Sequence, residues 1–234
     1  IGKNLQNHLS KNHTVINIDK ISGYDLLTCD LHYNADVVIH LAGLSGVRDS
    51  MQYPEEYWKQ NVIAGQRLFD FFKDTKILYA SSSTAYEPWR NPYAMSKYSL
   101  EQIAPENSVG MRFTTVYGPG AREQMLIPKI LKDDVDYINV DHSRDFIHID
   151  DILTAIGFLI TNPLPKKPKF VDVGTGVSNN LLDILSHLNI EVKDKRMGTI
   201  FERKDNVAHI GTLTKMGWIP QTNLLDYLKE NYDN

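Results

Sequence analysis

The stretch Asp36-Val-Val-Ile-His-Leu-Ala42 is a nearly continuous apolar run. Such a run is typical of a strand buried on both faces of a parallel sheet, since a half-exposed strand would alternate apolar and polar residues. Pro54 then opens a helix to about residue 73, because the missing proline N–H has no partner in the first helical turn anyway. The next strand is predicted at 76–81.

Strands and helices alternate on both sides of this segment. Helices are expected at 2–10, 54–73, 92–103, 125–131, 150–160, 180–188 and 224–231, and strands at 13–18, 36–42, 76–81, 109–117, 145–149 and 170–173, with a further possible strand at 25–29. The alternation predicts an α/β fold with a Rossmann-like, doubly wound parallel sheet and helices on both faces. It loosens after Gly118-Pro119-Gly120, which indicates a small, interwoven C-terminal part.

Composition excludes several classes of protein. A chain of 234 residues, 42% hydrophobic and 23% charged, is globular and needs no disulfide or metal to hold its core. A net charge of −4 gives no support to nucleic-acid or anionic-membrane binding, and no window has the roughly 18–20 apolar residues of a membrane span. The single Cys29 fits a reducing, cytoplasmic setting, and no histidine spacing indicates a metal site.

The segment Tyr93-Ala-Met-Ser-Lys97 carries chemistry. Residues four apart on a helix lie on one face about 6 Å from each other. A lysine ammonium at that distance stabilises a phenolate, so Tyr93 can serve as general base or acid. An ordinary amphipathic helix face can show the same Tyr-x-x-x-Lys spacing. The pair therefore indicates a catalytic site only together with the residues around it.

That context is the predicted strand Ile77-Leu-Tyr-Ala80, which runs into Ser81-Ser82-Ser83. Open α/β sheets bind ligands at the carboxyl ends of their parallel strands. A serine there can hydrogen-bond a substrate hydroxyl beside the tyrosine. The competing interpretation is a run of capping serines.

Four motifs in this order resemble the extended short-chain dehydrogenases/reductases. They are the strand with Ser-Ser and Tyr86, Pro92-Tyr-x-x-x-Lys97, Arg112-Phe-Thr-Thr-Val-Tyr-Gly-Pro119 and Arg144-Asp-Phe-Ile-His-Ile-Asp-Asp151. The resemblance is strongest to the NAD-dependent nucleotide-sugar epimerase/dehydratase group and extends from Ile1 to about Tyr227. It implies an NAD-binding domain over 1–118, to which residues 145–173 return, and a mainly substrate-binding domain over 119–234.

The resemblance also implies a catalytic triad of Ser82, Tyr93 and Lys97. Tyr93 would take the proton from a sugar hydroxyl while hydride passes to the nicotinamide. Lys97 would also hold the nicotinamide ribose, and Ser82 would stabilise the charge that develops on the sugar oxygen. Asn61 matches an asparagine that supports this site.

For NAD, the resemblance implies a set of contacts along the chain. Asp19, at the end of the predicted second strand, would bind the adenosine ribose and repel a 2′-phosphate, which favours NAD over NADP. Asp30 and Leu31 would meet the adenine; the competing interpretation of Asp30 is a turn carboxylate. The whole expected set is Gly2, Asp19, Asp30, Leu31, Leu41, Ala42, Gly43, Asn61, Tyr93 and Lys97.

Ile1-Gly2-Lys3-Asn4-Leu5 looks like the end of the glycine-rich loop that cradles the pyrophosphate in this family. The first strand and most of that loop are missing from the sequence, which we expect to be part of a longer chain.

The substrate contacts implied are Ser82, Thr115, Arg144 and Arg203. Arg144 matches an arginine that meets the substrate diphosphate, a role that suits bidentate guanidinium contacts. Arg203 resembles a second such arginine. Thr115 stands where the family usually has Asn.

The resembled family catalyses several reactions, and residues that some of them require are absent from this sequence. Ser83 and Thr84 stand where the dehydratases carry acids, and Thr84 and Gln124-Met125 supply neither the Cys nor the His of the 3,5-epimerase/reductases. The expected activity is C4 epimerisation of a nucleotide sugar, a UDP-hexose, through a transient 4-keto intermediate. An NAD(P)-dependent keto-sugar reductase and a non-catalytic dinucleotide-binding module remain as alternatives. The resemblance further implies a homodimer through the helices at 54–73 and 92–105.

Overall fold

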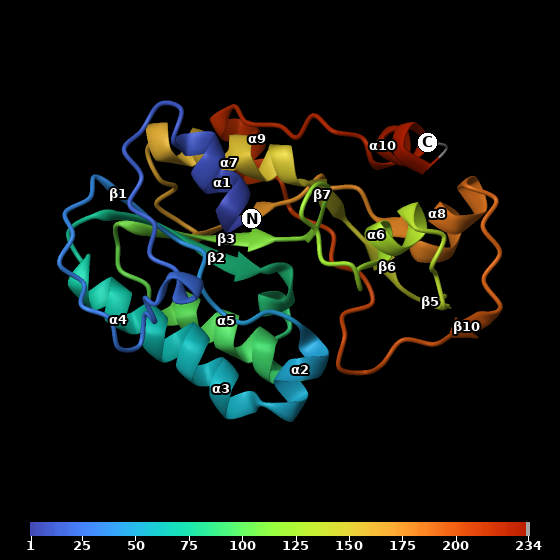
Figure 1. The fold of residues 1–234 in the computed structure, drawn as a ribbon, viewed down its shortest axis with the longest axis horizontal. Helices are drawn as coiled ribbons and strands as arrows, with labels where there is room; N and C mark the ends of the chain where they lie inside the picture. The colour runs from blue at the N-terminus through green and yellow to red at the C-terminus, as the bar shows by residue number, and fades with distance from the viewer. Residues whose placement is uncertain (233–234) are drawn as a thin grey trace. The chain divides into compact units, whose positions relative to one another are not determined.

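A four-stranded parallel sheet forms the centre of the fold in the computed structural model, which describes residues 1–232. Its order is β1 (Val37–His40), β2 (Lys76–Ser82), β3 (Ser108–Phe113) and β8 (Phe170–Val173) (Figure 1). Val38 lies opposite Ile77 in the β1–β2 register. The expected α/β class is therefore confirmed.

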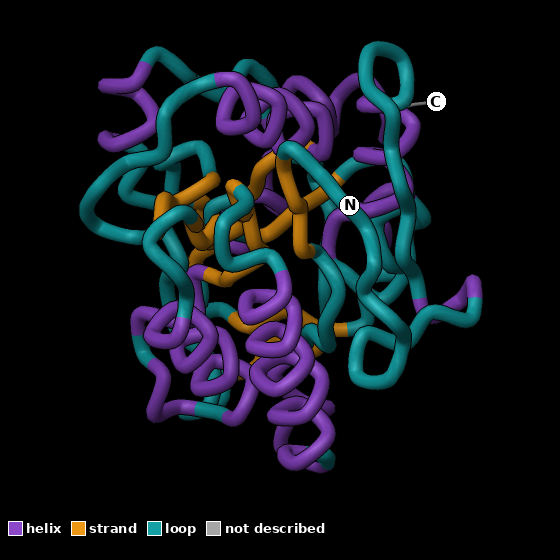
Figure 2. The backbone as a smooth tube through the Cα atoms, turned by 90° about the vertical axis from the view of Figure 1, so that its left-hand side faces the viewer, coloured by secondary structure: helices purple, strands orange, loops and turns teal. Residues whose placement is uncertain are grey.

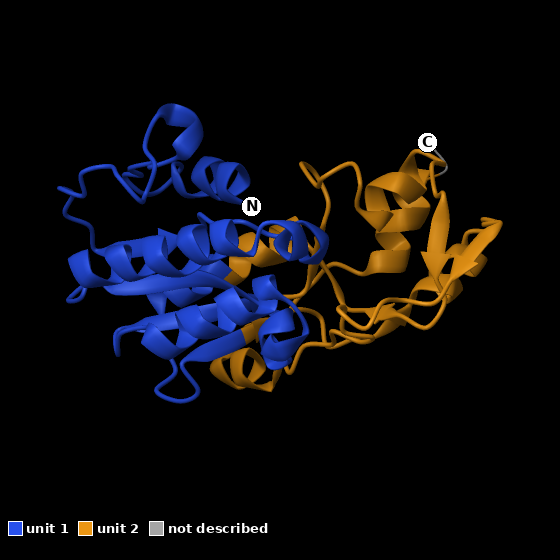
Figure 3. Ribbon diagram, turned by 90° about the horizontal axis from the view of Figure 1, so that it is seen from below, with its two compact units in different colours: residues 1–112, 156–171 blue, residues 113–155, 172–234 orange. Residues whose placement is uncertain are grey.

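The chain divides into two compact units (Figure 3). Unit 1 consists of residues 1–112 and 156–171, and unit 2 of residues 113–155 and 172–234. The chain thus leaves unit 1 at the last residue of β3, returns to it within the helix Ile149–Thr161, and leaves it again within β8.

Helices of unit 1 lie on both faces of its strands (Figures 1 and 2). One face carries α3 (Pro54–Trp58), α4 (Ala64–Phe71) and α5 (Pro92–Ile103), and the other carries α1 (Gly2–Leu9). A π-helical turn, η2 (Lys59–Ile63), joins α3 to α4, and α2 (Val47–Gln52) packs on α5. The short 3-10 turns are η1 (Lys20–Ser22), η3 (Ser83–Tyr86) and η4 (Pro88–Arg90).

Strand β2 is covered by other elements on both faces of the sheet, which is why its central residues are apolar. Ile77, Leu78 and Tyr79 are completely buried, although their side chains alternate between the faces. On one face Ile77 and Tyr79 meet Leu68 and Phe69 of α4, together with Leu100 of α5. The predicted strands at 36–42, 76–81 and 170–173 and the helices at 2–10, 54–73 and 92–103 are confirmed.

The described part of unit 2 contains three small strand pairs. β4 (Thr115–Tyr117) and β7 (Phe146–His148) are parallel, as are β5 (Tyr137–Asn139) and β10 (Asp194–Arg196), while β6 (Ser143–Arg144) and β9 (Asn179–Asn180) are antiparallel. The helices are α6 (Leu126–Leu131), α8 (Leu181–His187), α9 (Gly211–Met216) and α10 (Leu224–Tyr232), and α7 (Ile149–Thr161) passes from unit 2 into unit 1. A core built around Ile130, Leu185 and Leu228 fills this unit.

Two strand predictions are wrong. Residues 13–18 form no strand, and Ile16 is exposed, because no described strand lies beside them to pair with their backbone. Residues 25–29 form a turn in which the Asp25 carboxylate accepts a hydrogen bond from the Leu27 N–H. The run 109–117 is divided at Thr114 into β3 and β4. Among the described residues, no helix is both long and apolar enough to cross a membrane.

Gly65 allows α4 to approach α5 closely. A Cβ at this position would lie 2.5 Å from Leu100 Cδ1 and 3.4 Å from His40 Nε2, whereas a Cβ on Gly157 of α7 would meet nothing within 4 Å. We predict that Gly65→Ala destabilises the fold by about 1–3 kcal/mol through overpacking. Gly157→Ala, the matched control, should gain about 0.5–1 kcal/mol from lower unfolded-state entropy. Urea denaturation measures both, and equal effects of the two substitutions would contradict the packing argument.

Candidate active site

Ser82 ends β2 and begins the turn that follows. Its side chain is buried, and its Oγ accepts hydrogen bonds from the Thr84 N–H at 3.2 Å and the Thr84 hydroxyl at 2.9 Å. The serine therefore caps η3 while it stands at the carboxyl end of a central strand. Both interpretations drawn from the sequence, a cap and a strand-end hydroxyl, apply to the same residue.

Helix α5 carries Tyr93 and Lys97 on one face. Asn91 caps the helix, since its Oδ1 accepts a hydrogen bond from the Ala94 N–H at 2.8 Å, and Pro92 occupies the first turn. Tyr93 is half-buried, with its ring 6.1 Å from that of Tyr57 in an edge-on contact. One turn later, Lys97 is only 5% exposed and donates from Nζ to the Ala80 carbonyl of β2 at 3.0 Å.

Burial changes the acid–base properties of Lys97. Removal from water lowers its pKa to about 8, and the Glu101 carboxylate opposes part of that decrease. His40 of β1 is buried nearby, where desolvation and the Lys97 charge lower its pKa to about 3. This histidine is therefore neutral at physiological pH and packs edge-on against Phe69.

Asn61 joins this group from the π-helical turn. Its amide is fully buried, accepts from the Leu44 N–H at 2.7 Å, and donates to the Leu44 carbonyl at 3.0 Å and the Ser96 hydroxyl at 2.9 Å. The Gly43 backbone lies so close that a Cβ there would be 2.7 Å from Asn61 Oδ1 and 3.5 Å from Lys97 Nζ. The loop after β1 is thus fixed beside the lysine.

The predicted NAD contacts separate into two groups. Gly43, Asn61 and Lys97 are brought together, with Leu41 and Ala42 just before the glycine and Tyr93 on the same helix as the lysine. Asp19 is exposed and accepts from the Ile21 N–H, Asp30 is exposed beside buried Leu31, and Gly2 opens α1. No contact joins this second group to the first among those described, and its cofactor role stays a prediction.

Sequence reasoning missed the buried ion pair of Glu101 and Arg112. The guanidinium donates from Nε and Nη2 to the two carboxylate oxygens, at 2.7 and 2.5 Å. The Ser81 hydroxyl donates to the same carboxylate at 2.5 Å. For Glu101 the available signal was the spacing Tyr93-x-x-x-Lys97-x-x-x-Glu101, which puts three ionisable groups on one helical face; no such signal pointed to Arg112.

In unit 2, Arg144 lies in a polar network of its own. Its Nη1 donates to the Ser143 and Lys204 carbonyls, and its Nη2 lies 3.0 Å from His142 Nδ1 and 3.3 Å from Glu202 Oε2. Burial lowers the pKa of this arginine, and Arg203 lies close enough to contribute to that decrease. Arg144 and Arg203, predicted to act together, are therefore neighbours.

Asp145 fixes the segments around Arg144. Its buried carboxylate accepts from the backbone N–H groups of Thr175, Gly176 and Ala208 at 2.8–3.1 Å. Asn206 continues this network, since its Oδ1 accepts from the Asp145 N–H and its Nδ2 donates to the Thr115 hydroxyl. Thr115, the third predicted substrate contact of unit 2, is thereby linked to the strand of Arg144.

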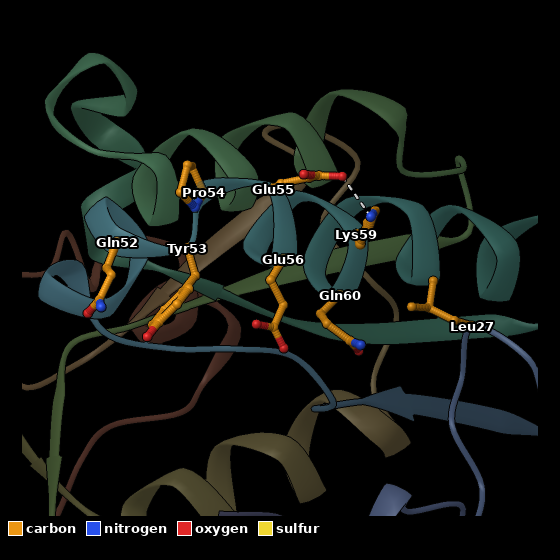
Figure 4. A pocket seen from close by; sticks show the side chains of 8 residues that line it. All are labelled: Leu27, Gln52, Tyr53, Pro54, Glu55, Glu56, Lys59 and Gln60. Carbon is orange, nitrogen blue, oxygen red and sulfur yellow. Dashed lines mark ion pairs between the residues drawn. The ribbon is translucent and has the colours of Figure 1, made fainter.

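A hollow of about 430 Å³ lies on unit 1 (Figure 4). Glu55 and Lys59 on its rim are paired with each other at 2.7 Å. None of the predicted site residues lines it. The lining residues are Leu27, Gln52, Tyr53, Pro54, Glu55, Glu56, Lys59 and Gln60.

The chain is similar in sequence to several proteins, among them enzymes named for nucleotide-sugar reactions. The chain is 30% identical to Protein CapI of Staphylococcus aureus over 66% of its own length, and spans 56% of that relative. It is 27% identical to a UDP-glucuronate 4-epimerase of Thermodesulfobacterium geofontis, over 94% of this chain and 78% of the relative.

Solved structures agree in fold. UDP-glucuronic acid 4-epimerase from Bacillus cereus, in complex with UDP-4-deoxy-4-fluoro-glucuronic acid and NAD, is 26% identical and superimposes with a TM-score of 0.77. The match covers 89% of this chain and 79% of that one. Other similar proteins are named CDP-abequose synthase and NDP-hexosamine 5,6-dehydratase, so the relatives perform more than one reaction.

The profile of one protein family matches residues 1–174, about three quarters of the chain. Its members are enzymes, and the family is NAD-dependent. The chain belongs to the NAD-dependent epimerase/dehydratase family, within the extended short-chain dehydrogenases/reductases.

Proposed function

We propose that the protein is an NAD-dependent nucleotide-sugar epimerase that inverts C4 of a UDP-hexose through a transient 4-keto intermediate. The observation that carries this proposal is the buried Lys97 ammonium, one helical turn from Tyr93 and beside the Gly43 loop. Two of the similar proteins are named UDP-glucuronate 4-epimerases, which supports the reaction type.

The residues at the carboxyl end of β1 fit a dinucleotide. Ala42 and Gly43 are exposed and small, and a side chain at Gly43 would collide with the amide that holds the loop. Lys97 would hydrogen-bond the nicotinamide ribose, Leu41, Ala42 and Asn61 would shape the adjoining surface, and the remaining contacts would come from Gly2, Asp19, Asp30 and Leu31. Bound NAD supplies the acceptor and donor of the hydride that leaves and returns to C4.

Tyr93 removes the proton from the C4 hydroxyl in this proposal and returns it in the second half of the reaction. The Lys97 charge favours the phenolate electrostatically, since opposite charges attract strongly in a partly dry site. The Ser82 hydroxyl donates to the sugar oxygen as negative charge develops on it. The Thr84 hydroxyl donates a hydrogen bond to the Ser82 oxygen and so keeps the serine hydroxyl at the end of β2.

The substrate diphosphate would be held by Arg144 and Arg203, with Thr115 as a further contact. All four terminal N–H positions of Arg144 already face acceptors. A diphosphate oxygen would therefore replace one acceptor, and the Glu202 carboxylate is the one whose replacement conserves the charge balance of the arginine.

The helices of unit 1 support the proposal of a homodimer. Trp58, Ile63 and Phe71 are between 43% and 47% exposed along α3, η2 and α4, and α5 exposes Met95, Tyr98 and Ile103. Contiguous patches of exposed apolar side chains commonly mark protein–protein interaction sites. A second copy joined through 54–73 and 92–105 would cover them.

Purified full-length protein should interconvert at least one of UDP-glucose and UDP-galactose or their N-acetyl forms, measured by chromatography of the nucleotide sugars. We predict that Tyr93→Phe reduces kcat by about 10²–10⁴-fold, because general acid–base catalysis contributes that much. Tyr98→Phe, an exposed tyrosine on the same helix, should leave kcat unchanged.

Full activity of Tyr93→Phe would contradict the proposed chemistry. Binding of NAD without turnover of any UDP-hexose would favour the non-catalytic module. Net reduction of a keto-sugar, with consumption of NADH or NADPH, would favour the reductase.

The pH dependence of kcat should follow the protonation state of Lys97. The lysine is protonated below its pKa of about 8 and loses its charge as pH rises through that value. We predict that kcat falls on the alkaline side with a midpoint near pH 8, since the phenolate then lacks its cation. A kcat that stays constant to pH 10 would contradict a role for the ammonium.

Arg144→Gln should raise KM for the nucleotide sugar by about 10–100-fold with a smaller effect on kcat, since a charge-assisted hydrogen bond contributes about 1.5–3 kcal/mol. Arg196→Gln is the control, because Arg196 is exposed and pairs with Asp194 in the same unit. An unchanged KM in Arg144→Gln would remove this arginine from the substrate site.

A further inference from the structure

Two buried cations, Lys97 and Arg112, are influenced by the buried Glu101 carboxylate. Arg112 is hydrogen-bonded to it, and the charge of the carboxylate offsets part of the decrease in the Lys97 pKa. Glu101 and Arg112 are 6% and 4% exposed, and Lys97, four residues before Glu101 on α5, is 5% exposed. At this spacing the lysine and the glutamate lie on one face of the helix. Burial of a charge is costly unless an opposite charge or hydrogen bonds compensate it.

The position of the carboxylate is strongly determined. Arg112 holds both oxygens in a two-point contact, and the Ser81 hydroxyl holds one of them. Ser81 immediately precedes Ser82, so the same strand end carries a bond to Glu101 and the hydroxyl proposed to meet the substrate.

The guanidinium is fixed in turn by two aromatic faces. The Arg112 carbon Cζ lies 4.1 Å from the centre of the Tyr86 ring and 3.5 Å from that of the Phe170 ring. Tyr86 belongs to η3, which begins after Ser82, and Phe170 belongs to β8. Five segments of unit 1, namely α5, β2, β3, η3 and β8, therefore meet around one ion pair, and rotation of the carboxylate would break its contacts with β2 and β3.

From this geometry we infer that Glu101 is a positioning residue, which keeps the Lys97 ammonium charged and the Ser81–Ser82 strand end in register with it. This inference rests on the proposed function. The other titratable groups here are Tyr93 on α5, His40 on β1, Tyr79 on β2 and Tyr86 on η3. His40 and Tyr79 are neutral near pH 7, since burial lowers the pKa of the histidine and raises that of the tyrosine. Glu101 is thus the negative charge that acts on both cations, on Arg112 by direct hydrogen bonds and on Lys97 through its charge.

A direct test titrates Lys97 by its ¹³Cε chemical shift in lysine-labelled protein, with the signal assigned by its loss in Lys97→Arg. Glu101→Gln keeps the shape of the side chain and removes its charge. The expected result is a Lys97 pKa lower by about one unit, a tenfold change in its protonation constant. Glu106→Gln is the matched control, since Glu106 is an exposed carboxylate paired with Lys169 and should leave Lys97 unchanged.

The double variant Glu101→Gln/Arg112→Met separates charge from structure. It removes both members of the ion pair, so no unpaired guanidinium repels the lysine, and the expected Lys97 shift is smaller than in Glu101→Gln. Glu101, and not Arg112, is the charge that shifts the Lys97 pKa in the wild type, so part of the decrease should remain in the double variant. If Glu101→Gln alone does not fold, a Lys97 pKa in the double variant equal to that of the wild type would overturn the inference.

Kinetics give the second readout. In Glu101→Gln, the alkaline limb of the kcat profile should move down with the Lys97 pKa, with a five- to tenfold loss at pH 8 and a KM for nucleotide sugar within twofold of the wild type. An unchanged Lys97 titration overturns the inference whatever the activity. A shifted titration in a protein that turns over no UDP-hexose supports the inference and rejects the proposed function, so the two failures are distinguishable.

Discussion

The hydrogen bond from the Lys97 ammonium to the Ala80 carbonyl determines much of the arrangement of unit 1. A charged group so far from water needs compensating partners at fixed positions, and these come from β2 and from its own helix. Helix α5 must therefore lie at one height along β2 and present one face to it. That requirement is met by the Asn91 cap, which sets where the helix begins, and by Gly65, which lets α4 pack close to α5.

Much of the fold could be predicted because the sheet strands are mainly apolar. The runs at 36–42 and 76–81 favour strands covered on both faces, and Pro54 and Pro92 mark the helix starts. The expected burial holds for β2, whereas Val37, Val38 and Ile39 of β1, at the edge of the described sheet, are only half-buried. The segment 13–18 has an equally β-like composition but no strand beside it, and pairing depends on a neighbour that local sequence does not reveal. The pairs β5–β10 and β6–β9 were not predicted for a related reason. Their strands have two or three residues and join segments far apart in the chain.

The candidate site was predictable where its chemistry is local. Tyr93 and Lys97 are one helical turn apart, and Ser82 follows a buried strand, so spacing alone suggests their proximity. The pair Glu101–Arg112 was not predictable in this way, since Arg112 stands on a different strand and nothing in the spacing of these two residues distinguishes a buried partner from a solvated one. Arg144 illustrates the same limit. Its identity suggests an anion ligand, but only the structure reveals that its hydrogen-bonding positions already have acceptors.

The path of the chain between the units has a consequence for biosynthesis. Unit 1 is interrupted after residue 112 and completed only by residues 156–171, which supply the end of α7 and the start of the edge strand β8. A nascent chain that has emerged as far as β3 therefore exposes an unpaired sheet edge until some sixty further residues have been synthesised. Exposed edges invite pairing with other chains. The stretch that follows β3 must consequently leave the ribosome before the edge is closed, and a fragment cut at residue 112 would keep that edge open permanently.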